Sequence, residues 1–366
     1  MKVAFVTTNL RGGGAEKAIL KLAVALSRRG HEAHLFLIEN IIDHPVDAAL
    51  HVHSLSRSGK RASKGFFGRM QAAWKLGRVH RRLEHDAPFD ATLSTLPFAD
   101  QVVVLARLPR VWHRIANTLS AEIDALKQRN PGKAARRLAR YRRLYEGRNL
   151  IAVSDGVAED FRERLQLRRA NIVRIYNPFD VDGIRHLALA SEPAIPQEPY
   201  VLHVGRFAPQ KRHDLLFQAF KTLPPSFKLV LLVNPSAALD EMLVAAGIKA
   251  RTLVAGFREN PYPWMRQAAL LVLCSDHEGL PNVLIESLIC GTPVVSTDCP
   301  SGPREILEGT LRRFLVPCGD PAALAQAMRA ALDTKPDLSE QIFAKFAMQN
   351  ILPQYEALPQ RWRQPA

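Results

Sequence analysis

The sequence predicts an α/β protein with two doubly wound domains, and three observations support this prediction. The chain has 366 residues, and at roughly 150 residues per domain this length fits about two domains. Hydrophobic residues make up 47% of the chain, so each domain can bury a core. The order strand, loop, helix, strand opens the chain and returns in its second half, and this order is typical of a parallel sheet.

The first half begins with an apolar strand predicted at residues 2–7. A glycine-rich loop follows, and apolar side chains then recur at helical spacing over residues 16–29. Gly30 ends this helix, and a second strand is predicted at residues 33–38. The apolar run before Arg11 is short, which predicts a first strand rather than a signal peptide, and we expect a cytoplasmic protein.

The second half repeats this order without a visible repeat of residues. Strands are predicted at residues 200–204, 228–233, 250–255, 270–274 and 293–296. Helices are predicted at residues 213–221, 264–269 and 281–290. The turn-rich and proline-rich segment 180–199 separates the halves. We therefore predict a first domain at residues 1–182, a second at 183–345, and a helical segment at 346–366 that crosses back to the first.

The composition narrows the possible partners. A net charge of +15 favours an anionic partner, such as nucleic acid, an acidic membrane surface or a phosphorylated substrate. The four cysteines form no C-x-x-C pair, and no histidine cluster shows metal-ligand spacing, so we expect free thiols, no metal and no bound cofactor. No apolar run approaches the roughly 20 residues that span a bilayer.

Residues 277–295 read HEGLPNVLIESLICGTPVV and place two glutamates, Glu278 and Glu286, around the start of a helix. The preceding run LLVLC predicts a buried strand, and Pro281 suits the first turn of the helix. Amide groups at this helix start, near Asn282 and Val283, would form an anion site. Carboxylates on both sides of an anion site suit a ligand with the order polyol, phosphate, polyol, which is the order in a sugar nucleotide.

Two other interpretations of these glutamates stay open. In the first, Glu278 caps the loop and Glu286 is a solvated helix residue, while the neighbouring leucines form core. In the second, the two acids are the carboxylate pair of a glycosidase, which would leave the adjacent anion site unexplained.

The loop after the strand at residues 200–204 carries Gly205, Arg206 and Lys211. Because the carboxyl ends of parallel strands meet at one edge of a sheet, this loop should face the same site as the glutamates. Two cations there favour binding of a diphosphate, since charge-assisted hydrogen bonds contribute about 1.5–3 kcal/mol each. A solvated surface pair is the alternative for these cations taken alone.

Six segments together resemble the retaining glycosyltransferases of family four. They are NLRGGGAEKA (9–18), AVSDGVAEDF (152–161), IYNPFD (175–180), HVGRFAPQKRHDLL (203–216), GFRENPYPWM (256–265) and SDHEGLPNVLIESLICGTPVVSTDCPSGPREIL (275–307). They follow the family's order over nearly the whole chain. The resemblance implies the GT-B architecture, two Rossmann-like doubly wound domains facing across a cleft. It also implies sugar transfer with retained anomeric configuration and without a metal.

The resemblance further implies a role for each matching residue. Arg206 and Lys211 would bind the donor diphosphate and stabilise the leaving group. Glu278 would contact the donor sugar, and Glu286 would bind the ribose hydroxyls. The phosphate cradle and sugar floor would be the backbone of Gly279, Leu280, Pro281, Asn282 and Val283.

Other matching residues would complete the site. The loop that frames the base would be Gly256 with Phe257 and Arg258, and Gly13 and Gly14 would close on the diphosphate and the acceptor. Many family members carry a histidine on the acceptor side. The segment HRIANTLS offers Asn117 at that place, with His113 a turn earlier, so the chain departs from the family pattern there.

Two stretches of the first half are strongly basic. Residues 57–82 hold nine Lys and Arg without an acidic residue, including Lys60 and Lys64, and also carry Phe66, Phe67, Met70 and Trp74. Residues 127–148 repeat the excess of Lys and Arg against a lone Glu146. A basic segment with aromatic residues fits an anionic membrane surface, although two solvated charged faces are the alternative. No nucleic-acid motif accompanies the charge, so we expect no specific nucleic-acid partner.

The sequence thus predicts a glycosyltransferase that uses a nucleotide sugar, expected to be UDP-linked, to extend a glycan acceptor, expected to be lipid-linked. It would work as a peripheral protein on the inner face of the cell membrane, in polysaccharide or glycoconjugate biosynthesis. A sugar-nucleotide 2-epimerase of the same fold is one alternative, and donor consumption without an acceptor would reveal it. A non-catalytic protein that binds anionic lipid or nucleic acid is the other, and it would show no nucleotide affinity.

Overall fold

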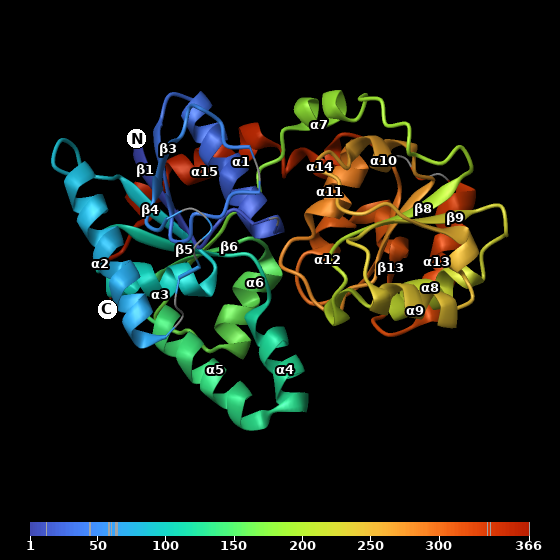
Figure 1. The fold of residues 1–366 in the computed structure, drawn as a ribbon, viewed down its shortest axis with the longest axis horizontal. Helices are drawn as coiled ribbons and strands as arrows, with labels where there is room; N and C mark the ends of the chain where they lie inside the picture. The colour runs from blue at the N-terminus through green and yellow to red at the C-terminus, as the bar shows by residue number, and fades with distance from the viewer. Residues whose placement is uncertain are drawn as a thin grey trace. The chain divides into compact units, whose positions relative to one another are not determined.

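The computed structural model describes residues 1–11, 13–43, 45–57, 59, 61–62, 65–334, 336 and 338–365. The chain divides into two compact units (Figure 1). The first contains residues 1–178 together with 348–366, and the second contains residues 179–347. The last helices therefore belong to the first unit, which they reach after the whole second unit has been traversed.

Among the described residues, a seven-stranded parallel sheet with the order β3-β2-β1-β4-β5-β6-β7 forms the centre of the first unit. The strands are β1 (Lys2–Thr7), β2 (Glu32–Leu37), β3 (His51–Ser54), β4 (Ala91–Thr95), β5 (Val111–Ile115), β6 (Asn149–Ala152) and β7 (Asn171–Arg174). The helices are α1 (Gly14–Arg28), α2 (Phe66–Leu83), α3 (Pro97–Leu105), α4 (Leu119–Arg129), α5 (Pro131–Tyr145), α6 (Asp155–Glu159), α15 (Met348–Glu356) and α16 (Leu358–Arg361).

The second unit has a parallel sheet of six described strands in the order β10-β9-β8-β11-β12-β13. They are β8 (Tyr200–Val204), β9 (Lys228–Leu232), β10 (Thr252–Val254), β11 (Leu270–Leu273), β12 (Val294–Thr297) and β13 (Leu315–Val316). The helices are α7 (Val181–Leu187), α8 (His213–Lys221), α9 (Ala237–Ala245), α10 (Tyr262–Gln267), α11 (Asn282–Ile289), α12 (Pro303–Ile306), α13 (Pro321–Thr334) and α14 (Gln341–Ala344). These two sheets confirm the predicted α/β class with two doubly wound units.

Helix boundaries differ from the prediction where the capping residues could not be read from periodicity. Helix α1 begins at Gly14, two residues before the predicted start, because Gly13 supplies an extended N-cap. Helix α10 begins at Tyr262, whose backbone N–H donates to the side chain of Asn260 at 3.2 Å. Pro281 is the extended N-cap of α11 rather than a residue of its first turn. Apolar periodicity therefore located these helices, and local capping set their ends.

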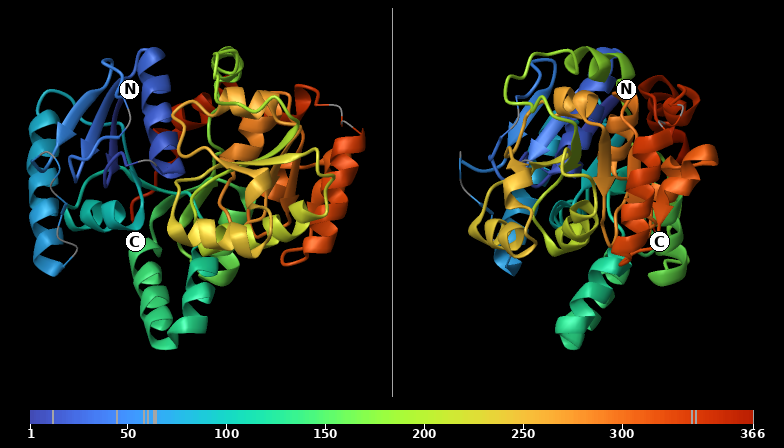
Figure 2. Two further views of the ribbon diagram at one scale, coloured as in Figure 1. Left: turned by 45° about the vertical axis from the view of Figure 1, so that its right-hand side comes forward. Right: turned by 90° about the vertical axis from the view of Figure 1, so that its right-hand side faces the viewer.

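One core cluster of the first unit lies between the sheet and helices α2 and α3. Its buried side chains come from β1 and β2, from both helices, and from Phe89 in the loop before β4. Helices α4 and α5 pack against each other as a hairpin that extends away from this sheet (Figure 2). The buried Asp160 carboxylate accepts hydrogen bonds from the backbone N–H groups of Leu119 and Ser120 at 3.1 and 3.2 Å, and so caps the start of α4. Along the described parts of the chain, no helix combines the length and the apolar character needed to cross a membrane.

Candidate functional site

The predicted donor residues of the second unit follow two neighbouring strands. Strands β8 and β11 pair in parallel, so the loops after Val204 and Leu273 leave the sheet at the same edge. From β8 the chain continues to β9 on one side and later returns to β11 on the other. The order of the strands therefore reverses between β8 and β11, and ligands of doubly wound sheets bind at the carboxyl edge beside such a point.

The structure brings Lys211 and Glu278 together at this edge. The Lys211 Nζ atom lies 2.6 Å from Oε1 of Glu278, and the two side chains are 15% and 12% exposed. The Ser275 hydroxyl donates a second hydrogen bond to the same carboxylate oxygen, also at 2.6 Å. The cation and the carboxylate were both predicted, but Ser275, three residues before Glu278 in the same loop, was not.

Further hydrogen bonds fix the two loops to each other. The Gln210 side chain donates to the His277 carbonyl at 2.5 Å, and the Asp276 backbone N–H donates to the Gln210 carbonyl at 2.9 Å. Arg212 adopts a left-handed backbone conformation, with φ of 47°, and binds both Asp214 and Asp276. The hydrogen bond from Arg212 lowers the pKa of the Asp214 carboxyl. These contacts hold Lys211 and Glu278 on a rigid pair of loops.

A Cβ atom at Gly205 would be in ordinary van der Waals contact with two neighbouring side chains. A Cβ atom on it would stand 3.4 Å from the His203 Nε2 atom and 3.6 Å from Lys211 Cε. The His203 ring is buried and its Nδ1 lies 2.9 Å from the Val272 carbonyl oxygen. Burial lowers the pKa of His203 to about 3, so the ring is neutral at physiological pH. Arg206, next along the loop, is exposed.

The loop before α11 depends on a close approach by Gly302. This glycine has φ of 89°, and a Cβ atom on it would lie 2.5 Å from Pro281 Cδ and 2.8 Å from the Gly279 carbonyl oxygen. Leu280 is buried beneath this contact. The segment from Gly279 to Pro281 therefore packs closely on Gly302. Asn282 and Val283 follow at the amino end of α11, where backbone N–H groups point out of the helix.

Glu286 lies on α11 and is bound by a tyrosine, not by Lys211. The Tyr262 hydroxyl donates to Glu286 Oε1 at 3.2 Å, which connects α11 to α10. The sequence predicted Glu286 but not Tyr262. The Phe257 side chain is 49% exposed beside Gly256, which has φ of 78°.

Arg258 is held by an aromatic ring and a carboxylate. Its guanidinium carbon lies 5.4 Å from the centre of the Trp264 ring, and its Nε atom lies 4.0 Å from Oε2 of Glu192. The position of this predicted base-framing residue therefore depends on Trp264, which the sequence did not single out.

The predicted residues of the first unit lie in separate surroundings. Gly13 caps α1, and a Cβ atom on it would lie 2.1 Å from Oε2 of Glu16, while one on Gly14 would meet no atom within 4 Å. The Asn117 amide donates to Oε1 of Glu122 at 2.9 Å.

His113, which lies a turn before Asn117 in the sequence, is a buried residue. It lies on β5, a strand that is buried on both faces from Trp112 to Ile115. Its Nδ1 atom is 2.7 Å from Ser94 Oγ and 3.3 Å from Asp100 Oδ1.

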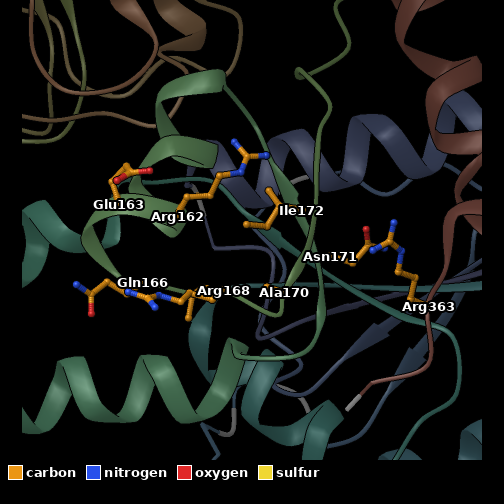
Figure 3. Close-up of a pocket in the computed structure, with 9 residues that line it drawn as sticks. Arg162, Glu163, Gln166, Arg168, Ala170, Asn171, Ile172 and Arg363 are labelled. Carbon is orange, nitrogen blue, oxygen red and sulfur yellow. The ribbon is translucent and has the colours of Figure 1, made fainter.

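A hollow of about 590 Å³ lies elsewhere in the first unit, at the amino end of β7 (Figure 3). Its lining includes Arg162, Glu163, Gln166, Arg168, Asn171 and Arg363. The glycine-rich loop follows the carboxyl end of β1, at the opposite edge of this parallel sheet. The hollow therefore contains none of the predicted donor or acceptor residues.

Family models match both units. The model described as Glycosyltransferase Family 4 matches residues 12–182, and the model described as Glycosyl transferases group 1 matches residues 198–334. Among curated proteins, the chain is 27% identical over 337 residues to the N-acetylgalactosamine-N,N'-diacetylbacillosaminyl-diphospho-undecaprenol 4-alpha-N-acetylgalactosaminyltransferase of Campylobacter jejuni. That alignment covers 91% of this chain and 90% of the relative. The lipopolysaccharide core biosynthesis glycosyltransferase LpsD of Rhizobium meliloti is 24% identical, with 91% and 88% covered.

Solved structures show the same fold. The sucrose-phosphate synthase of Thermosynechococcus elongatus superposes with a TM-score of 0.78 at 17% identity, covering 98% of both chains. HepE of Anabaena, solved in complex with UDP and glucose, superposes with a TM-score of 0.73 at 18% identity, covering 97% of this chain and 98% of that one. At these identities the likeness concerns the fold.

Proposed function

The chain belongs to the family-four glycosyltransferases, and from that premise we propose that it moves a sugar from a UDP-linked donor to a lipid-linked glycan acceptor. The observation that carries the proposal is the contact between Lys211 and Glu278 at the carboxyl edge of the second sheet. In this contact, the Lys211 ammonium group can bind a phosphate and the Glu278 carboxylate can bind sugar hydroxyls. Both lie beside the amino end of α11, where an anion is favoured.

The proposed reaction breaks the bond between the anomeric carbon and the donor diphosphate. Negative charge then develops on the departing diphosphate, and preorganised cations stabilise it. We assign this role to Lys211 and Arg206, with Glu278 holding the donor sugar and Glu286 holding the ribose. We further propose that the transfer retains the anomeric configuration and requires no metal, as in the family that the sequence resembles.

Relatives support the choice of substrates. The Campylobacter relative acts, by its name, on a glycan linked through a diphosphate to undecaprenol. HepE has been solved with UDP-glucose as well as with UDP. We transfer both features to this chain as a proposal: a UDP-sugar as donor, and an acceptor that is anchored in a membrane by a lipid.

Calorimetric titration tests the donor half of this proposal. UDP, with GDP and ADP as competitors, is titrated into the wild type, into Arg206→Ala and into the matched control Arg312→Ala. Arg312 is also an exposed arginine of the second unit, but it precedes β13 and so lies toward the amino edge of the sheet. UDP affinity should fall in Arg206→Ala and stay unchanged in the control. If the folded wild-type protein bound no nucleoside diphosphate, the proposed donor site would be wrong.

The first unit supplies a surface suited to the proposed lipid-linked acceptor. Helix α2 buries one side against the sheet and exposes Phe66, Phe67, Met70 and Trp74, which are 62%, 86%, 43% and 59% exposed. Arg78, Arg81 and Arg82 continue this exposed side toward the carboxyl end of the helix, and the Arg78 guanidinium lies 5.5 Å from the centre of the Trp74 ring. Aromatic residues beside arginines suit the interface of an anionic bilayer.

Not every basic residue of the two stretches serves this surface. Arg69 donates to the Gln101 side chain at 3.0 Å and Lys75 donates to the Leu55 carbonyl at 3.2 Å, while Lys60 and Lys64 lie outside the described residues. In residues 127–148, the exposed cations lie on the hairpin of α4 and α5 or at its ends. They are Lys127, Arg129, Lys133, Arg136, Arg140 and Arg143. We propose that the α2 surface and this hairpin dock on anionic lipid.

Vesicle co-sedimentation tests the docking. The wild type should sediment with vesicles that contain anionic lipid and should not sediment with neutral vesicles. Replacing Arg78, Arg81 and Arg82 with Gln should weaken binding roughly a hundredfold, at about 1 kcal/mol for each cation. Trp74→Ser should weaken it further, whereas Val244→Ser, an equally exposed apolar residue on α9 of the second unit, should have no effect. Equal partitioning to neutral and anionic vesicles would contradict the proposal.

A further inference from the structure

A group of metal-ligand side chains lies on the sheet of the first unit, whereas the proposed donor residues Arg206, Lys211, Glu278 and Glu286 belong to the second. Strands β2 and β3 pair in parallel, and His34 is the register partner of His51. Side chains alternate along a strand, so Glu32 shares a face with His34, and His51 shares a face with His53. The two pairs meet on the side of the sheet that packs against Phe89, whose ring lies 5.1 Å from that of His34.

Three of these side chains converge. One ligand atom from each of Glu32, His34 and His51 lies within 4.8 Å of the others. Zinc holds nitrogen and oxygen ligands at about 2.0–2.2 Å in a tetrahedral arrangement, which separates the ligand atoms by roughly 3.4 Å. Glu32 and His51 are exposed, so their side chains can rotate to close the remaining distance, while the buried His34 stays fixed. The geometry points to a zinc-binding site formed by Glu32, His34 and His51.

His53 completes the arrangement as a partner of the central ligand. Its Nε2 atom lies 2.9 Å from Nδ1 of His34, and the two rings are stacked with centres 5.1 Å apart. When Nε2 of His34 binds the metal, Nδ1 carries the proton and donates it to His53. Such a second hydrogen bond fixes the tautomer and orientation of a metal-binding histidine. The same His34 Nε2 atom lies 2.7 Å from Oε1 of Glu32, and zinc would replace this contact.

One neighbouring charge opposes the cation. Lys2 Nζ lies 3.7 Å from Oε1 of Glu32, and it also donates to the carbonyls of Leu83 and Ala87 at 2.6 and 3.3 Å. A dication bound by Glu32 would be repelled by this ammonium group. Replacing Lys2 with Met should therefore strengthen zinc binding. A substitution that only destabilised the protein would weaken zinc binding, so a gain in affinity supports the site.

The site would stabilise the edge of the sheet. Strand β3 is at the end of the described strand order and pairs with β2 alone. Glu32 and His51 are the first residues of their strands, so the site lies toward the amino edge, whereas the glycine-rich loop follows the carboxyl end of β1. Zinc would join β2 to β3 without touching the proposed transferase residues, so this inference does not rest on the proposed function.

The experiment is a zinc titration of the full chain, free of any affinity tag and treated with a chelator. Calorimetry should show one zinc per chain, and thermal unfolding should shift upward with zinc. His51→Ala should lose at least tenfold in zinc affinity, and His53→Ala should lose ten- to a hundredfold, as for other partners of metal-binding histidines. His186→Ala removes an exposed histidine of the second unit and serves as the control.

Two results would overturn the inference. The first is the absence of stoichiometric zinc binding by the folded wild type. The second is an isotherm for His51→Ala that matches the wild type, because zinc would then sit on other groups, such as the exposed Cys318 thiol. UDP titration of the same variants should give wild-type affinity, and this separates a failure here from a failure of the proposed donor site.

Discussion

Replacing Lys211 with Met separates a structural ion pair from a diphosphate ligand. Lys211 and Glu278 are each more than four-fifths buried and lie 2.6 Å apart. Without the ammonium group, Glu278 keeps the Ser275 hydroxyl as a donor but loses its charged partner. Losing the partner of a buried polar group costs about 1–3 kcal/mol. A loss of about 2 kcal/mol would lower the unfolding temperature by roughly 4–8 °C in a unit of this size.

The effect on the donor is a separate quantity. A charge-assisted hydrogen bond to phosphate contributes about 1.5–3 kcal/mol, which corresponds to a loss of roughly 10- to 150-fold in UDP affinity. Turnover should fall by about 10²- to 10³-fold, as when a preorganised charge-stabilising donor is removed. Calorimetry with UDP measures the affinity, and thermal unfolding measures the stability, on the same preparation.

The double variant Lys211→Met with Glu278→Gln decides between the two roles. A glutamine at 278 can still accept the hydrogen bond from Ser275 and no longer leaves a buried charge unpaired. Stability should therefore return toward that of the wild type, while UDP affinity stays low. If UDP affinity returned together with stability, or if Lys211→Met bound UDP as tightly as the wild type, Lys211 would be a structural residue and the assigned role would be wrong.

Three other substitutions test other parts of the second unit. Glu286→Ala should mainly weaken donor binding, and an unchanged UDP affinity would count against the ribose contact. Gly302→Ala places a Cβ atom 2.5 Å from Pro281 Cδ at φ of 89°, so it should lower the unfolding temperature and UDP affinity together, whereas normal values of both would show that this loop can shift. Burial lowers the pKa of His213 to about 4, whereas the same histidine in the unfolded chain takes up a proton near pH 6.5. Below that pH the unfolded state binds more protons, so the free energy of unfolding should fall by up to about 3 kcal/mol between pH 6.5 and 4. His213→Phe should flatten that slope in thermal unfolding measured across this pH range, and an unaltered slope would mean that other groups take up the proton.

The sequence was sufficient for the fold class because the predicted strands and helices have clear apolar patterns, whereas strands β3 to β7 of the first unit were not predicted individually. Strands β8 and β11 were both predicted, and the carboxyl-edge rule then placed Lys211 and Glu278 in one site without knowledge of distances. The contacts of Ser275 and Tyr262 could not be predicted in the same way. Tyr262 lies on α10 and Glu286 on α11, so their contact depends on how the two helices pack. Ser275 meets Glu278 through the local turn of the loop after β11, which apolar patterns do not describe.

His113 and His34 both show that separation along the sequence does not predict which side chains share a site. His113 is near Asn117 in sequence, yet its strand turns it into a buried contact with Ser94 and Asp100. His34 and His51 are 17 positions apart and match no metal-binding spacing, yet the register of two parallel strands makes them neighbours. A ligand set divided between strands depends on that register, and a shift of one residue would turn His51 to the opposite face. Prediction of such a site therefore requires the strand pairing itself, which apolar patterns in single strands do not specify.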